Sequence, residues 1–106
     1  MGAASLVTIL VASAASVYVE PSGSCGGNTP CYSTIQAAID AASSGNAIKI
    51  AEGSYDEALT LSSSKDLTLQ GGWDSTFTSQ SLTSTANSIT FDQDSGTIEI
   101  DNLTLQ

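Results

Sequence analysis

The chain of 106 residues is long enough for one domain, and its charge argues against two classes of partner. Eleven acidic residues stand against two lysines, with no arginine or histidine, so the net charge is -9. Nucleic acids and anionic lipids need basic side chains to neutralise phosphate, so neither is an expected partner. Only 12% of residues are charged, and 30 Ser and Thr residues supply most of the polarity, which is typical of strand faces and turns.

Residues 1–16 predict a secretory leader, which leaves 17–106 as the mature domain. Their apolar run, Leu6–Val11, is too short to span a bilayer, which needs roughly 20 residues. Ala12-Ser13-Ala14 fits the small-residue pattern of a cleavage site, although no basic residue precedes the apolar run. The alternative is an N-terminal strand, and the leader would make the protein secreted or cell-surface.

The first predicted strand, Val17–Glu20, is ended by Pro21 and followed by a loop with the only two cysteines. Cys25 and Cys31 are close together behind a predicted leader, which favours a disulfide in an oxidising compartment. Their spacing is too wide for a redox C-x-x-C motif. Two thiols without histidine cannot complete a structural zinc site.

A short helix is predicted over Ser33–Ser44. Ser33 and Gln36 fit an S-x-x-Q capping box, and Gly45 is a typical left-handed stop after a helix. An apolar stripe at helical spacing predicts that this helix covers the end of a β structure and protects its edge from pairing with other chains. The stripe consists of Ile35, Ala38, Ile39 and Ala42.

After Gly45 the apolar residues alternate with a period of two, which predicts short strands joined by short turns, among them Glu52–Tyr55. Such strands leave many open edges in a flat sheet, so we expect them to stack coil upon coil. The residues expected to face the interior are Ile48, Ile50, Leu59, Leu61, Leu67, Leu69, Ile89, Phe91, Ile98, Ile100, Leu103 and Leu105.

A four-residue repeat suggests the length of one coil. Leu67–Gln70 and Leu103–Gln106 have the same sequence and start 36 residues apart, whereas Ile48 and Leu67 are 19 apart. The shorter interval suits one coil. The longer interval suits two coils, or one coil with an excursion in Gly71–Ser88.

Three motifs resemble the N-terminal cap of right-handed parallel β-helix proteins of the pectate-lyase-like superfamily. They are the Thr-Ile-Gln-Ala-Ala-Ile segment Thr34–Ile39, the turn Gly53-Ser54-Tyr55, and Gly71-Gly72-Trp73-Asp74. The resemblance covers about 17–106 and implies an all-β, right-handed parallel β-helix of about three coils with a short capping α-helix. The superfamily includes polysaccharide-active enzymes and adhesins, so the resemblance indicates a fold and not an activity.

The residues that would carry catalysis in this superfamily are not matched. Its lyases abstract a proton with a basic side chain, commonly arginine, beside acids that bind Ca²⁺, and this chain has no arginine. Lys49 lies between two inward isoleucines and Lys65 in a turn, so both are expected to be solvated charges. No enzyme activity is therefore expected of this chain.

The carboxylates are weak candidates as well. Glycoside hydrolysis needs two carboxylates across a cleft, and Asp92 and Asp94 are the best pair. They are expected to form a turn, with a weak Ca²⁺ site at this pair or at Glu99 and Asp101 as the alternative, and no other cofactor. Glu99 and Asp101 alternate with isoleucines and should point outward.

Trp73 and Tyr55 are expected to be structural, with stacking on sugar rings as the alternative. The function expected from these observations is a non-catalytic extracellular or surface module, structural or adhesive, with carbohydrate binding as one option. Two alternatives stay open. The chain is the front of a polysaccharide lyase or glycoside hydrolase with active coils beyond residue 106, or it is a subunit that pairs with another copy through its open C-terminal edge.

Overall fold

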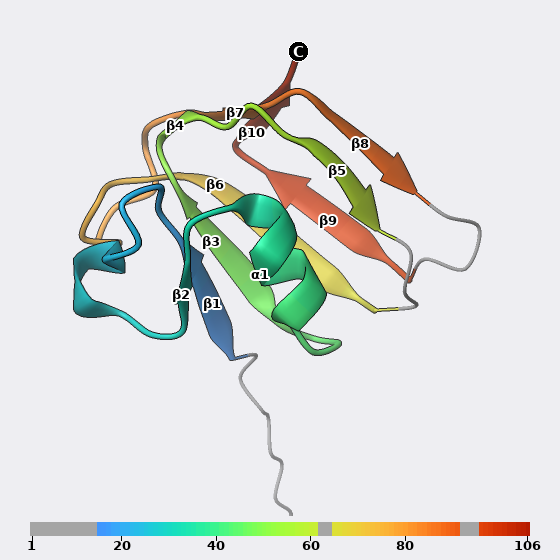
Figure 1. Ribbon diagram of the computed structural model, residues 1–106, viewed down its shortest axis with the longest axis horizontal. Coiled ribbons are helices and arrows are strands. Elements are labelled where there is room, and N and C mark those ends of the chain that lie inside the picture. The colour runs from blue at the N-terminus through green and yellow to red at the C-terminus, as the bar shows by residue number, and fades with distance from the viewer. Residues whose placement is uncertain (1–14, 62–64, 92–95) are drawn as a thin grey trace, which may run out of the picture.

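The computed structural model describes residues 15–61, 65–91 and 96–106 (Figure 1). The predicted leader therefore lies almost wholly outside the described residues. The described part is mostly β, with one short α-helix and a 3₁₀ turn at Cys25–Gly27. The elements are β1 (Ser16–Val19), β2 (Cys31–Tyr32), α1 (Ile35–Ala41), β3 (Ala47–Ala51), β4 (Gly53–Ser54), β5 (Ala58–Leu61), β6 (Leu67–Trp73), β7 (Ser84–Ala86), β8 (Ser88–Phe91), β9 (Ile98–Asp101) and β10 (Leu103–Leu105).

The strands form three sheets, and every registered strand pair in the described residues is parallel. A five-stranded sheet has the order β2-β1-β3-β6-β9, a three-stranded sheet β10-β7-β4, and a two-stranded sheet β5-β8. From β3 onward the chain visits these sheets in a fixed rotation. The prediction of parallel pairing is confirmed.

The register shows which segments are equivalent. Ile48 pairs with Leu69, and Leu67 pairs with Ile98, whereas Leu103 pairs with Ser84 in a different sheet. The two Leu-Thr-Leu-Gln segments are therefore not equivalent, and the 36-residue repeat is wrong. Four residues of common types carry too little information to set a register, which here depends on loops of unequal length.

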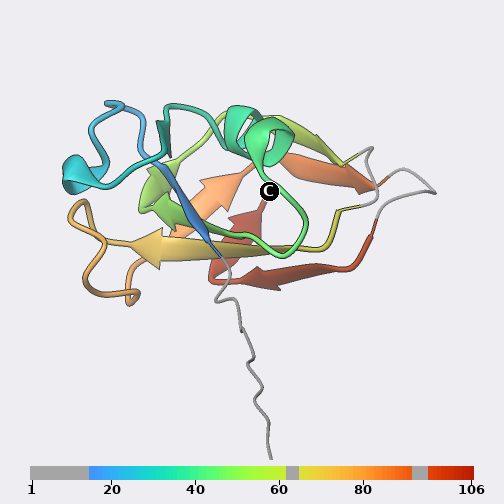
Figure 2. The same cartoon turned by 90° about the horizontal axis from the view of Figure 1, so that it is seen from below.

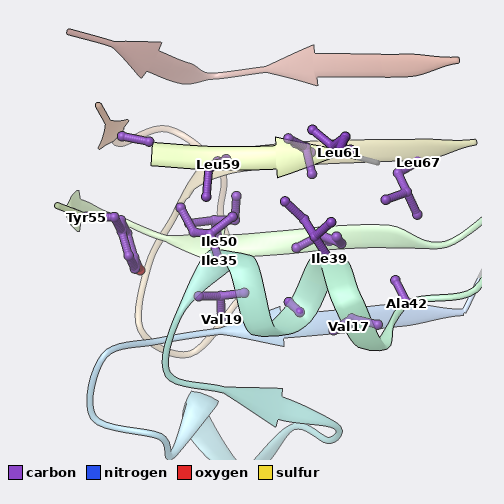
Figure 3. Close-up of a cluster of buried hydrophobic side chains, with 14 residues drawn as sticks. Val17, Val19, Ile35, Ile39, Ala42, Ile50, Tyr55, Leu59, Leu61 and Leu67 are labelled. Carbon is purple, nitrogen blue, oxygen red and sulfur yellow. The ribbon is translucent and has the colours of Figure 1, made fainter. Parts of the chain in front are cut away.

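The inward side chains of the three sheets meet in one apolar core, and α1 contributes to it (Figure 3). Ile35 and Ala38 of α1 are fully buried, so the predicted docking of the helix stripe is confirmed. Burying an aliphatic side chain of this size is worth about 1.5–3 kcal/mol, which makes this core the main source of stability. Other buried members are Val17, Val19, Ile39, Ala42, Ile48, Ile50, Tyr55, Leu59, Leu61, Leu67, Leu69 and Ala86.

The helix is shorter than predicted and is capped by a different residue. The N-cap is Thr34, whose side-chain oxygen accepts a hydrogen bond from the backbone N–H of Ala37 at 3.1 Å. The expected capping box of Ser33 and Gln36 is therefore wrong, because the Gln36 side chain contacts β5 instead. The chain leaves the helix at Ala42, ahead of Gly45, which has the expected positive φ of 93°.

The segment expected to be a turn, Glu52–Tyr55, contains a strand. Gly53–Ser54 is β4, which pairs with Ser84–Thr85 of β7. The expected excursion after Gly71 likewise contains a strand, so it leaves the sheets only between β6 and β7. Figure 2 shows α1 (green) and β9 (red) on opposite sides of the molecule.

Candidate functional site

The predicted disulfide joins Cys25 and Cys31 with a Cα–Cα distance of 5.8 Å. Cys25 is fully buried in a second small apolar cluster with Phe77. Its loop is fixed by Glu20, whose carboxylate accepts a hydrogen bond from the backbone N–H of Cys25 at 2.7 Å. The disulfide indicates an oxidising compartment. In the part of the chain that the structure describes, no helix is long and apolar enough to cross a membrane.

Trp73 ends β6 and is partly buried on the outer side of the five-stranded sheet. The Nζ atom of Lys49 lies 4.6 Å from the centre of its ring, and the ring of Phe77 lies 6.4 Å away. Lys49 faces outward as predicted, but it contacts the rings of Trp73 and Tyr18 rather than only water. A sugar on this face of the indole would compete with Lys49, and sugar stacking on Trp73 stays a prediction.

Tyr55 lies inside the core and is 5% exposed. Its hydroxyl donates a hydrogen bond to the backbone oxygen of Ala51 at 2.8 Å. Burial raises the pKa of the Tyr55 phenol above its ordinary range, and the charges of Glu20, Glu57 and Glu52 add to the effect. Tyr55 is therefore a protonated donor inside the fold, which leaves Trp73 as the more accessible of the two candidate sugar contacts.

The predicted Ca²⁺ site at Asp92 and Asp94 lies outside the described residues. Within the described residues, no group of three or more His, Cys, Asp or Glu side chains could hold a metal ion, and no pocket is present. Asp74 is partly exposed, and the backbone N–H of Thr78 and the groups of Thr76 that donate to its carboxylate hold its pKa below the ordinary value. This carboxylate organises the turn after Trp73.

One end of the molecule is closed by α1. The Gln36 side chain binds the backbone of Thr60 in β5 with two hydrogen bonds of 2.8 and 3.0 Å. Glu57 accepts hydrogen bonds from the first two backbone N–H groups of the helix, and the Nζ atom of Lys65 donates to the backbone oxygens of Ile39 and Asp40 at its last turn. Lys65 was expected to be solvated, but it caps the helix.

The opposite end is open. Phe91 of β8, Ile100 of β9 and Leu105 of β10 are 53%, 41% and 44% exposed. Each is registered beside a buried residue of the preceding strand in its sheet, so each belongs to an inward-facing row. The outer edges of β8, β9 and β10, together with these three side chains, are called the end face below. The sequence predicted these residues to be inward but did not show that they are exposed.

No model of a protein family matches the chain, and no curated protein and no solved structure matches it either. The resemblance to the pectate-lyase-like superfamily therefore rests on the three quoted motifs.

Proposed function

We propose that the protein is a non-catalytic structural module of an extracellular, right-handed parallel β-solenoid, with α1 at the closed end of the stack. The fixed rotation through three parallel sheets supports this proposal. Parallel strands joined by crossovers are right-handed in nearly all proteins, which supports the handedness. The disulfide supports an extracellular location, because such bonds persist in oxidising compartments.

The single observation that carries the proposal is the contrast between the two ends. At one end, the Gln36 amide occupies the backbone of Thr60, where a further strand would pair. At the other, the apolar rows of all three sheets end at exposed side chains. A stack that is sealed on one side and open on the other is what the first part of a larger scaffold requires.

Polysaccharide binding is a second candidate, favoured by one observation. Trp73, Tyr18 and Lys49 lie together on the outer side of the five-stranded sheet, and aromatic rings with nearby polar groups suit sugars. A glycan array tests this candidate, with Trp73→Ala as the variant. We expect loss of any binding in Trp73→Ala and retention in Phe91→Ala, which changes an aromatic residue on the end face.

The non-catalytic part of the proposal is tested with the purified protein on a panel of acidic and neutral polysaccharides, with and without Ca²⁺. We expect no new reducing ends and no unsaturated products above a heat-denatured control. Turnover that follows the folded protein through purification would overturn the proposal.

Titration of the native protein with a thiol reagent should find no reactive cysteine, as the disulfide requires.

A further inference from the structure

The end face exposes an apolar row that is covered everywhere else. In the five-stranded sheet, Val17, Ile48, Leu69 and Ile100 are registered in consecutive strands. The first three are buried and only the last is exposed. The same change occurs between the last two strands of the other two sheets. The interior of the stack is therefore accessible at this face through three side chains that would be buried by one more layer.

The backbone of the same face is also unpaired on one side. β8, β9 and β10 are each the terminal strand of their sheet among the described residues (Figure 1). A terminal strand offers a row of N–H and C=O groups to which another strand can be added. Apolar side chains and open backbone edges on one face are the two features that strand addition uses.

The charge pattern of the existing pairs defines what can be added. In the outward rows, Glu99 of β9 lies beside Thr68, and Asp101 lies beside Gln70. The basic residue Lys49 also lies beside an uncharged residue, Gln70. No registered pair in the described residues places two carboxylates opposite each other. Like charges that face each other across strands are destabilising, so an added strand must bring uncharged or basic residues beside Glu99 and Asp101.

A second copy of the chain does not meet this requirement. In a twofold dimer that brings the end faces of two copies together, β9 of one copy runs antiparallel to β9 of the other. Centring the pair on Glu99 places Glu99 opposite itself, and centring it on Ile100 places Glu99 opposite Asp101. These registers pair most of the strand and keep the isoleucines on one side, yet both oppose carboxylates.

Head-to-tail stacking of copies is obstructed at the other end. The Gln36 side chain already binds the backbone N–H and C=O of Thr60 on the edge of β5. The edge of β1 is covered by β2, which pairs with Tyr18 and Val19. An end face that meets this closed end therefore finds occupied backbone groups on β5 and on β1, that is, in two of the three sheets.

We propose that the end face binds a strand-forming segment of a different sequence, which places apolar residues over Phe91, Ile100 and Leu105 and uncharged or basic residues beside Glu99 and Asp101. The inference rests on the proposed function, because it treats the stack as a scaffold that continues. It adds that the partner has a different sequence and is selected by the charges at the outward positions of β9.

The test uses a charge-reversed form of the same chain as the partner. The probe is the double variant Glu99→Lys/Asp101→Lys, mixed one to one with the wild-type protein and examined by sedimentation velocity. We expect the wild-type protein alone and the variant alone to be monomeric. A pair of wild-type copies places carboxylates opposite carboxylates, and a pair of variant copies places lysines opposite lysines. The mixture should form a heterodimer at least about tenfold tighter than either self-association. Raising the salt to about 1 M should weaken it, because the Debye length falls to about 3 Å.

Matched controls separate this face from net charge. Glu52→Lys, matched to the single variant Glu99→Lys, has the same charge change away from the end face, and its mixture with the wild-type protein should stay monomeric. Ile100→Asp in the wild-type partner should abolish the heterodimer. Circular dichroism checks that each variant is folded, and Glu99→Lys alone replaces the double variant if that one is not.

The inference is overturned if the charge-reversed mixture stays monomeric, if the wild-type protein self-associates as tightly as the mixture, or if the Glu52→Lys control associates as well as Glu99→Lys. The proposed function fails by a different readout, namely turnover of a polysaccharide. The sedimentation results and the polymer assay therefore separate failure of the end face from failure of the proposed function.

Discussion

The side-chain amide of Gln36 binds the backbone of Thr60 as a neighbouring strand would. Its Oε1 accepts a hydrogen bond from the N–H of Thr60 at 2.8 Å, and its Nε2 donates to the C=O of the same residue at 3.0 Å. Thr60 lies within β5, the edge strand of the two-stranded sheet on the side of α1. One side chain thereby occupies both outward-facing polar groups of that residue, which limits strand addition at this edge.

We expect Gln36→Ala to lower the free energy of unfolding by about 1 kcal/mol, because three hydrogen bonds are lost, two to Thr60 and one to Asp40, and alanine's higher helix propensity offsets part of the loss. The uncovered edge of β5 should also increase self-association. Chemical denaturation and sedimentation velocity measure the two effects. Ala41→Ser is the control, because it changes an exposed residue of the same helix without removing a hydrogen-bond partner of Gln36. Equal stability and equal association of the two variants would contradict the role given to Gln36.

Glu57 binds the N-terminus of α1 from outside the helix. Its two carboxylate oxygens accept hydrogen bonds from the backbone N–H groups of Ile35 and Gln36, each at 2.9 Å. These donors have no partner within the helix, and a negative charge there also interacts favourably with the helix dipole. We expect Glu57→Ala to cost about 2 kcal/mol and Glu57→Gln about 1 kcal/mol, since the amide keeps one acceptor.

Thermal and chemical denaturation measure these costs, with Glu52→Ala as the control because Glu52 is an exposed carboxylate between β3 and β4. A loss of stability in Glu52→Ala as large as in Glu57→Ala would show that general charge, rather than the two hydrogen bonds to the helix, explains the effect.

Elements governed by local pattern could be predicted from the sequence, whereas the choice of partners could not. Alternating aliphatic residues predicted the strands, and the helical spacing of Ile35 and Ile39 predicted the docking of α1. The register failed at Leu67 and Leu103, because it depends on loop lengths that a four-residue match does not measure. The helix cap failed for a similar reason, since adjacent Ser33 and Thr34 are both favoured N-cap residues and the tertiary contacts of Gln36 decide between them.

The candidate site shows the same limit. Alternation predicts Leu69 and Ile100 to be inward in equal measure, and only the arrangement of the sheets shows that Ile100 is the exposed last member of its row. Glu57 and Lys65 hold the two ends of the helix from more than 20 residues away along the chain, so no local motif marks them. The disulfide was predictable because the chain has only two cysteines and they are close together.

Gly72 should be the glycine least tolerant of substitution, and Gly23 provides a matched control. Their φ values are 79° and 81°, but a Cβ at Gly72 would collide with the backbone oxygen of Leu82, whereas nothing lies near one at Gly23. The N–H of Gly72 also donates to the Oγ of fully buried Ser84 at 2.8 Å. We expect Gly23→Ala to cost about 1 kcal/mol from backbone strain and Gly72→Ala about 1–3 kcal/mol more from the clash. Equal losses in chemical denaturation would contradict the close approach.

The buried phenol of Tyr55 should make stability fall at alkaline pH. Its pKa in the folded protein is raised above the ordinary value of 10.0, first by burial and then by the neighbouring glutamates. The unfolded chain loses this proton at lower pH than the folded protein does. The contribution of the protonated phenol to the free energy of unfolding is therefore fully present below about pH 10 and is lost as the pH rises above that value.

Tyr55→Phe isolates this effect. It removes the hydrogen bond to the Ala51 oxygen, so we expect the free energy of unfolding at neutral pH to fall by about 1 kcal/mol. Above about pH 10, however, the variant should lose stability with a shallower slope than the wild-type protein, because one titrating group is gone. Urea denaturation at a series of pH values measures both quantities. A variant that keeps the full wild-type slope would show that another group causes the alkaline loss and that Tyr55 ionises as easily in the folded protein as in the unfolded chain.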